Sequence, residues 1–217
     1  SNLQFDPAGK KGIRGVEFFN DESSEGYGRT LEWYLKVLRQ SNDIFVTSGC
    51  DSHDSTLDLD DSDRWTRKTW VFSEKLDAKS LLEAMAQGHT YATEYGVSLE
   101  NLNYIPGFQT QEVERPKFLF SVAFDKKITN SKTIQIYRDG KLIEGSVQTH
   151  KKENIKGLQK IAYAWEDKGA KEGEEHQYVI EVEGVLITSP IRLKIKTKPV
   201  PIADTAVIEG KYFSQDY

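Results

Sequence analysis

Short apolar runs and one helical stripe alternate in the first part of the chain. Residues 15–20 (GVEFFN) and 44–47 (IFVT) are typical of buried strands. Between them, Thr30 is suited to a helix N-cap. The apolar residues that follow it recur at the spacing of one helical face: Leu31, Tyr34, Leu35 and Leu38. A strand, a helix and a strand in this order favour two parallel strands joined by a crossover helix.

A second group of elements follows an acidic loop. Residues 69–72 form a third apolar run, and Asp77 is suited to capping a helix over residues 78–87. Three residues of this helix are predicted to face the interior: Leu81, Leu82 and Met85. Gly88 should end the helix, and residues 91–93 are predicted to form a last short strand.

The period changes after Pro106-Gly107, where we place a domain boundary. From Pro116 onward, apolar and polar residues alternate, as on strands with one buried face. Five segments carry this alternation: 118–124, 134–137, 161–165, 178–182 and 191–195. Asp139-Gly140 between two apolar segments is a strong hairpin signal. Several short strands separated by turn signals predict an antiparallel sandwich.

Composition narrows the class of protein. An apolar share of 37% and a charged share of 29% are typical of a soluble globular protein. No apolar run approaches the roughly 20 residues of a membrane span, and the N-terminus shows no signal-peptide pattern. A net charge of −5 argues against nucleic-acid binding, which needs clustered Lys and Arg. The single Cys50 cannot form an internal disulfide, so it does not identify a compartment.

Residues 48–53 (SGCDSH) carry the most informative chemistry. They follow a predicted buried strand, so Asp51 and His53, two apart in extended chain, are expected to project from one face at the carboxyl end of that strand. A carboxylate beside an imidazole is a common ligand pair for Zn²⁺, Mn²⁺ or Fe, and α/β sheets place their sites at such strand ends. The alternative is a loop Asp that bonds backbone amides next to a surface His.

Four parts of the chain carry a family resemblance. They are 15–20 (GVEFFN), 48–53 (SGCDSH), 69–93 through its parts TWVF, LLEA and GHTYAT, and 187–191 (ITSPI). In order and spacing they are similar to the polymerase-and-histidinol-phosphatase (PHP) superfamily, in its branch with a C-terminal sandwich domain. The segment SGCDSH resembles the last Gly-(Ser/Cys)-Asp-x-His motif of that family. The likeness covers about residues 12–195.

The resemblance implies both a fold and a domain division. Residues 1–107 would be the C-terminal portion of a PHP-type distorted (β/α) barrel of parallel strands, an α/β fold. Residues 108–198 would be an all-β antiparallel sandwich of immunoglobulin-like or fibronectin type III-like form, and residues 199–217 a C-terminal tail. Half a barrel exposes strand edges and an apolar face, so we expect cover from dimerisation, from packing on the sandwich, or from a missing N-terminal segment.

The resemblance also implies an activity. In the family, a cluster of up to three metals generates a hydroxide that attacks a phosphorus or carbonyl centre. Asp51 and His53 would be metal ligands for Zn, Mn or Fe, and the substrate of the full-length protein a small phosphorylated or ester compound. The other family ligands begin with an upstream His-x-His, which this sequence lacks. We therefore expect an incomplete site, no catalytic residue of its own, and an inactive fragment. A secreted or cell-envelope location follows from the resemblance alone.

Residues after the motif offer weaker candidates. Arg64 and Arg67 lie close enough to the motif in sequence to reach a substrate phosphate, with Trp65 as an aromatic contact. Together with Trp70, Tyr91 and Tyr95, Trp65 is also a candidate for an aromatic wall around a ligand near the metal site. The alternatives are ordinary exposed arginines and rings that pack against the fold. Five aspartates between residues 54 and 63 suggest a Ca²⁺-binding loop. If Asp58 is taken as the first position of an EF-hand loop, however, Asp63 stands at the sixth position, where that motif needs Gly.

Two other function classes compete with the metal-dependent hydrolase. One is a non-catalytic binding or scaffold module, in which the sandwich docks a glycan, a peptide or another domain and the Asp-x-His is vestigial. The other is a Ser or Cys hydrolase, which the absence of a Gly-x-Ser-x-Gly elbow disfavours. A His-x-His with further His or Glu ligands upstream of Ser1 would favour the hydrolase, and their absence the module.

Overall fold

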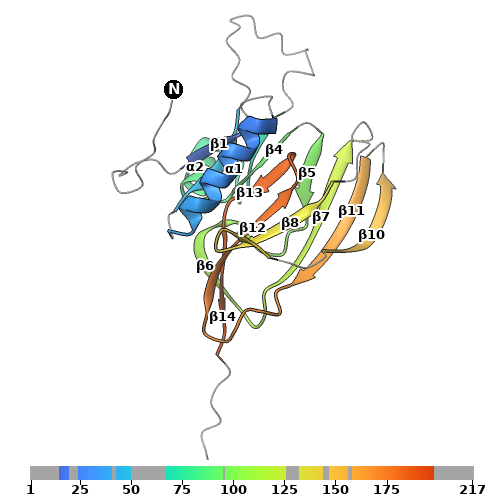
Figure 1. The fold of residues 1–217 in the computed structure, drawn as a ribbon. Coiled ribbons are helices and arrows are strands. Elements are labelled where there is room, and N and C mark those ends of the chain that lie inside the picture. The colour runs from blue at the N-terminus through green and yellow to red at the C-terminus, as the bar shows by residue number, and fades with distance from the viewer. Residues whose placement is uncertain are drawn as a thin grey trace, which may run out of the picture.

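The chain folds mainly into antiparallel β-sheet. The computed structural model describes residues 15–19, 24–40, 43–49, 67–94, 96–125, 132–143, 147–155 and 158–197. Within these residues, two helices accompany fourteen strands (Figure 1). The predicted α/β barrel is therefore wrong, because the described strands form a two-sheet sandwich with one small parallel pair beside it.

The larger sheet has eight strands. Six of them follow one another: β3 (Lys68–Val71), β4 (Thr90–Thr93), β13 (Leu186–Thr188), β12 (Glu175–Val182), β14 (Ile191–Ile195) and β6 (Gly107–Val113). The other two extend from β12: β8 (Ile134–Arg138), and β9 (Lys141–Leu142) beyond it. Only the β14–β6 pair in this sheet is parallel among the described pairings. The sheet takes strands from both sides of residue 107 and so runs across the boundary placed there.

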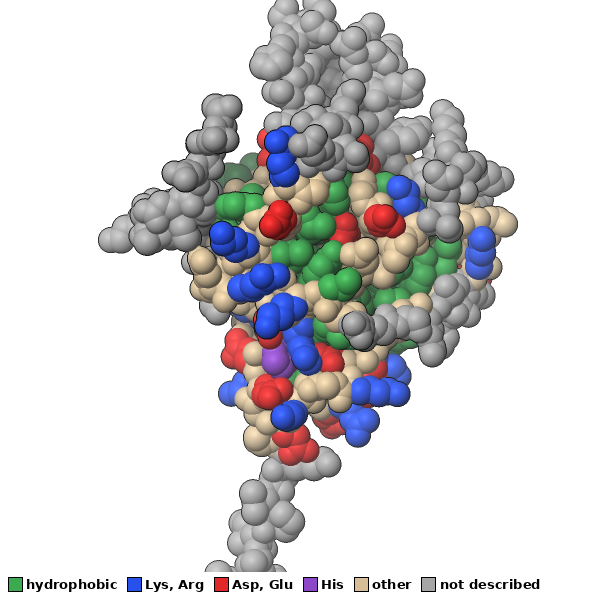
Figure 2. All heavy atoms as spheres, viewed as in Figure 1, with side chains coloured by type: hydrophobic (Ala, Val, Ile, Leu, Met, Phe, Trp, Pro, Cys, Tyr) green, Lys and Arg blue, Asp and Glu red, His purple; other side chains and the backbone are tan. Residues whose placement is uncertain are grey.

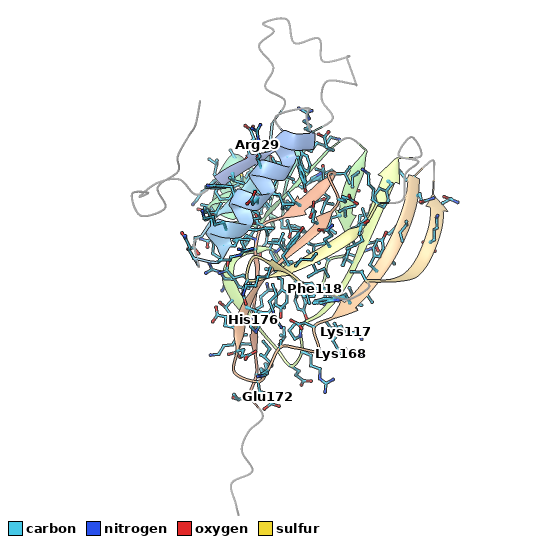
Figure 3. The ribbon with its side chains drawn as sticks, viewed as in Figure 1. Arg29, Lys117, Phe118, Lys168, Glu172 and His176 are labelled. Carbon is cyan, nitrogen blue, oxygen red and sulfur yellow. The ribbon has the colours of Figure 1, made fainter. Side chains whose placement is uncertain are left out.

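The smaller sheet packs against the larger one over the main hydrophobic core. Its strands are, in order, β10 (Gln148–Ile155), β11 (Leu158–Glu166), β7 (Lys117–Asp125) and β5 (Val97–Glu100). The alternation predicted for β7 is confirmed, because Phe118, Phe120 and Val122 are buried in this core. Phe118 lies between the sheets (Figure 3), with its ring centroid 5.1 Å from that of Tyr178 on β12.

The first three elements form the parallel unit that the sequence predicts. They are β1 (Gly15–Phe18), α1 (Ser24–Leu38) and β2 (Phe45–Ser48), and β1 pairs with β2 in parallel register. A second core, which includes Phe18, Tyr34 and Val46, joins the unit to Val179 and Ile187 of the larger sheet. Packing on the sandwich, one of the three expected forms of cover, is confirmed for this unit.

The helix α2 (Ala78–Ala86) begins as predicted but does not join two parallel strands. Its start is as predicted, since the Asp77 carboxylate accepts from the Ser80 amide at 2.8 Å, and Gly88 follows it with a φ of 76°. Of its described residues only Ala84 is buried, and Leu82, predicted to face inward, is 66% exposed. The strands on either side of α2, β3 and β4, pair antiparallel, so they do not form the parallel crossover unit of a barrel.

The predicted Asp139-Gly140 hairpin is confirmed. Both residues have positive φ, 52° and 70°, as a two-residue turn between twisted strands needs. The Gly140 carbonyl accepts two hydrogen bonds from the Arg39 guanidinium, at 3.2 and 3.0 Å, which tie the end of α1 to the sandwich. Neither of the helices in the described residues is long and apolar enough to cross a membrane.

Candidate functional site

The carboxyl ends of β1 and β2 lie side by side. Ser48 ends β2 opposite Phe18 of β1, and Gly49 follows as the first Gly of the predicted metal motif. The predicted ligands Asp51 and His53 lie outside the described residues, and so do Cys50, Arg64 and Trp65. The structure therefore describes the strand that leads into the motif and the side chains that hold that strand.

Two buried side-chain hydroxyls form hydrogen bonds with the main chain in the middle of β2, on the edge of this strand that does not face β1. The Val46 amide donates to Ser189 Oγ at 3.0 Å, and Thr90 Oγ1 donates to the Val46 carbonyl at 2.7 Å. The two hydroxyl oxygens are 2.8 Å apart, and both side chains are fully buried. Buried main-chain groups need partners, and here side chains of the larger sheet provide them in place of a neighbouring strand.

A third hydroxyl bonds the end of β2. Thr69 Oγ1 accepts from the Ser48 amide at 2.8 Å and donates to the Ser48 carbonyl at 3.2 Å. Ser48 Oγ also donates to the Thr93 carbonyl at 3.4 Å. We call Thr69, Thr90 and Ser189 the hydroxyl clasp. It holds Val46 and Ser48 of β2 against the larger sheet.

Glu17 on β1 contacts the first residue of the motif. A Cβ placed on Gly49 would collide with a carboxylate oxygen of Glu17, so a larger residue at this position would force the Glu17 side chain to turn away. Glu17 itself is exposed. A carboxylate thus lies directly beside the point where the segment containing Asp51 and His53 begins.

Phe19 marks the end of β1 with an unusual backbone. Its φ is 59°, a left-handed conformation that costs a bulky residue energy, and its side chain is buried. The ring stacks on Tyr27 of α1 with centroids 5.3 Å apart. The Tyr27 hydroxyl donates to the buried Glu181 carboxylate at 2.7 Å, and burial raises the pKa of Tyr27 above its usual range. Sparsely populated backbone conformations concentrate at functional sites, which directs attention to this end of the pair.

Arg67 is the one predicted substrate contact within the described residues. Its Nε donates to Glu94 Oε1 at 3.2 Å, and its side chain is largely buried. Trp70 and Tyr91 are packed side chains rather than a ligand wall: their rings stack 5.7 Å apart, and Trp70 Nε1 donates to Thr93 Oγ1 at 3.0 Å. Arg67 thus already has a carboxylate partner inside the chain.

A separate cluster of titratable groups surrounds His176 on β12 (Figure 3). Its Nδ1 lies 2.7 Å from Asp139 Oδ2, and its Nε2 lies 3.1 Å from Glu174 Oε2. The Lys171 amide and then His176 lower the pKa of Glu174. Positive and negative side chains are interspersed at this end (Figure 2). Both ring nitrogens are therefore occupied, and His176 is a structural residue.

Sequence reasoning did not identify the hydroxyl clasp. Thr69 and Ser189 lie in two of the segments that carry the PHP resemblance, but nothing in their local pattern links either of them to β2. Within the described ranges, no group of three or more His, Cys, Asp or Glu side chains is arranged to hold a metal ion. Comparisons with protein-family models, with curated proteins and with solved structures found no match to this chain.

Proposed function

We propose that this chain contributes Asp51 and His53 to the divalent-metal site of a PHP-type phosphoesterase or related hydrolase. The observation that supports the proposal is the strand before the motif: β2 is parallel to β1, is held by the hydroxyl clasp, and is followed in sequence by the motif. Parallel strands bind their ligands at the carboxyl edge. The proposal concerns the metal site alone and does not depend on the barrel fold of the PHP family.

The described residues would act by positioning. The clasp fixes Ser48, and Gly49 leaves space for the Glu17 carboxylate. A ligand pair that leaves a rigid strand end loses less freedom when it binds a metal than one on an unsupported loop. A divalent metal, when bound, would supply a water of lowered pKa as the nucleophile and would polarise the substrate.

Two protein ligands are fewer than such a metal needs. Catalytic zinc sites have three protein ligands and an open position. Glu17 is a described carboxylate beside Gly49, and the PHP resemblance implies that the remaining ligands lie upstream of this sequence. We therefore expect the chain alone to bind one ion weakly and to lack hydrolase activity.

Metal loading tests the proposal. The protein is stripped with a chelator, loaded with Mn²⁺ or Zn²⁺, and analysed for bound metal in parallel with Asp51→Asn, His53→Ala and the control His150→Ala. We expect up to one ion per chain in the unmodified protein and in His150→Ala, and a loss of about tenfold or more in metal affinity in the other two.

Activity is then measured on the complete gene product with p-nitrophenyl phosphate. His53→Ala should abolish most turnover with little effect on melting temperature, since removing one imidazole loosens the ion that supplies the nucleophile. If the complete gene product binds no metal and is inactive, or if its His53→Ala variant keeps full activity, the proposal is contradicted. The binding or scaffold module would then be the better account.

A further inference from the structure

A cleft lies beside α2, apart from the end of β2. Its volume is about 840 Å³, within the range of roughly 300–1,000 Å³ that small-ligand sites occupy. One wall is a single face of α2 and its end, formed by Ser80, Glu83, Ala84 and Gln87 at helical spacing. The opposite wall comes from the chain after β3 and from the segment before β6.

The cleft has an apolar lining. Phe72 follows β3 and packs on Tyr91 with ring centroids 5.6 Å apart. Ala84 is buried, whereas Ile105 is 51% exposed. An exposed isoleucine beside a partly buried phenylalanine leaves apolar surface in water, and a ligand ring would cover it.

His89 supplies the central polar group. Its ring lies against Gly107, where an added Cβ would stand 2.6 Å from His89 Cδ2. Burial lowers the pKa of His89, so near neutral pH the ring is uncharged, with one donor and one acceptor nitrogen. Among the residues that the structure describes, no hydrogen bond joins either ring nitrogen of His89 or the side-chain amide of Gln87 to another group, whereas the main-chain amide of Gln87 bonds within α2. Two neutral groups that both donate and accept are thus available to a ligand.

The charges at the cleft balance only when a neighbour of the lining is counted. The lining carries two carboxylates, Glu74 and Glu83, and one cation, Lys75. Lys79 lies outside the lining and pairs with Glu83 at 3.9 Å. These four side chains together have no net charge that would select an anion or a cation.

We infer that this cleft binds a small uncharged ligand, with an apolar ring that covers Phe72 and Ile105 and an amide or similar donor–acceptor group that bonds His89 and Gln87. The inference does not depend on the proposed hydrolase activity. The ligand class follows from the cleft itself, where neutral hydrogen-bonding groups lie next to apolar surface.

Three probes of one shape test the inference. Benzamide is neutral, benzoate anionic and benzylamine cationic at pH 7.5, and each is titrated into ¹⁵N-labelled protein up to about 10 mM while the amide signals are followed by NMR. We expect benzamide to shift the signals of Gln87 and His89 and to bind at least about threefold more tightly than the two charged probes.

Variants identify the groups that bind the probe. His89→Ala and Gln87→Ala should each weaken benzamide binding by about three- to tenfold, as expected for one lost hydrogen bond. Gln109→Ala, an exposed position on β6 outside the cleft lining, should leave the affinity unchanged. Melting curves establish that each variant is folded, and Gln87→Ala keeps the test decisive if His89→Ala unfolds.

Several results would overturn the inference. They are the absence of benzamide binding up to 10 mM, equal binding of all three probes, signal changes confined to other parts of the protein, and unchanged affinity in the folded cleft variants. Preferred binding of benzoate or benzylamine would also reject it, since the ligand class would then be charged.

Discussion

The interactions that hold the strands of the sandwich together differ from those that attach the β1–α1–β2 unit to it. Within each sheet, neighbouring strands exchange main-chain hydrogen bonds, and the rings of β7 fill the space between the sheets. The unit instead joins the sandwich through a second core and through side-chain hydrogen bonds, which include the hydroxyl clasp and the bonds of Arg39 and Tyr27. Main-chain ladders form with almost any side chain, whereas the clasp depends on three particular residues. The region that leads into the candidate site is thus the one that a single conservative substitution can loosen.

The largest expected effect is in the sandwich core. Phe118→Ala should lower the free energy of unfolding by about 3–5 kcal/mol, because it leaves a cavity between the two sheets. Its neighbour on β7 serves as the control: Leu119 is 41% exposed on the other face, and Leu119→Ala should cost less than about 1 kcal/mol. Urea denaturation measures both. Equal losses would mean that the two faces of β7 are not buried differently.

Disrupting the hydroxyl clasp should lower the free energy of unfolding by less than Phe118→Ala does. Thr90→Val keeps the shape of the side chain but removes the partner of the Val46 carbonyl and of the Ser189 hydroxyl. We expect a loss of about 1–3 kcal/mol, the cost of buried polar groups left without partners. Thr133→Val, at an exposed position before β8, should change stability by less than about 0.5 kcal/mol.

Hydrogen exchange separates a local effect from a global one. In Thr90→Val, the amides of β2 should exchange faster by a larger factor than those of β7, since the clasp hydroxyls bond the main chain of β2 and not that of β7. A uniform change across both regions would show that the unit and the sandwich unfold as one.

The smallest effect is expected at alkaline pH. Burial raises the pKa of Tyr27 and of Tyr137, whose hydroxyls both donate to Glu181 between α1 and the larger sheet. A raised pKa in the folded state stabilises the fold fully below the unfolded value of about 10, and this contribution falls as pH rises above it. The unfolding free energy should therefore decline between about pH 10 and 11, and less steeply in Tyr27→Phe. An identical slope in that variant would contradict the assignment.

Sequence patterns predicted where helices, strands and turns lie better than they predicted which strands pair and in which direction. The alternation of β7, the Asp77 cap of α2 and the Asp139-Gly140 turn were all predictable, because each depends on residues close in sequence. The antiparallel pairing of β3 with β4 was not, since a strand, a helix and a strand fit either direction until the burial of the helix is known. Leu82 shows the same limit, because an apolar residue on a helix says nothing about whether another element covers it.

The candidate site was predictable only in part. The position of the motif after a buried strand follows from sequence, and β2 ends at Ser48 as that pattern requires. The roles of Thr90 and Ser189 do not, because a hydroxyl can bond its own backbone, water or a distant strand, and only the fold decides which. The contact between Glu17 and Gly49 likewise depends on the register of β1 with β2.

The most direct test of the proposed metal site is an anomalous difference map from crystals of the protein soaked in Zn²⁺ and measured on both sides of the zinc absorption edge. Our account predicts one peak within about 2.0–2.2 Å of a His53 ring nitrogen and an Asp51 carboxylate oxygen, beyond the carboxyl end of β2. A map without a peak at those two residues, or with its strongest peak elsewhere on the protein, would contradict it.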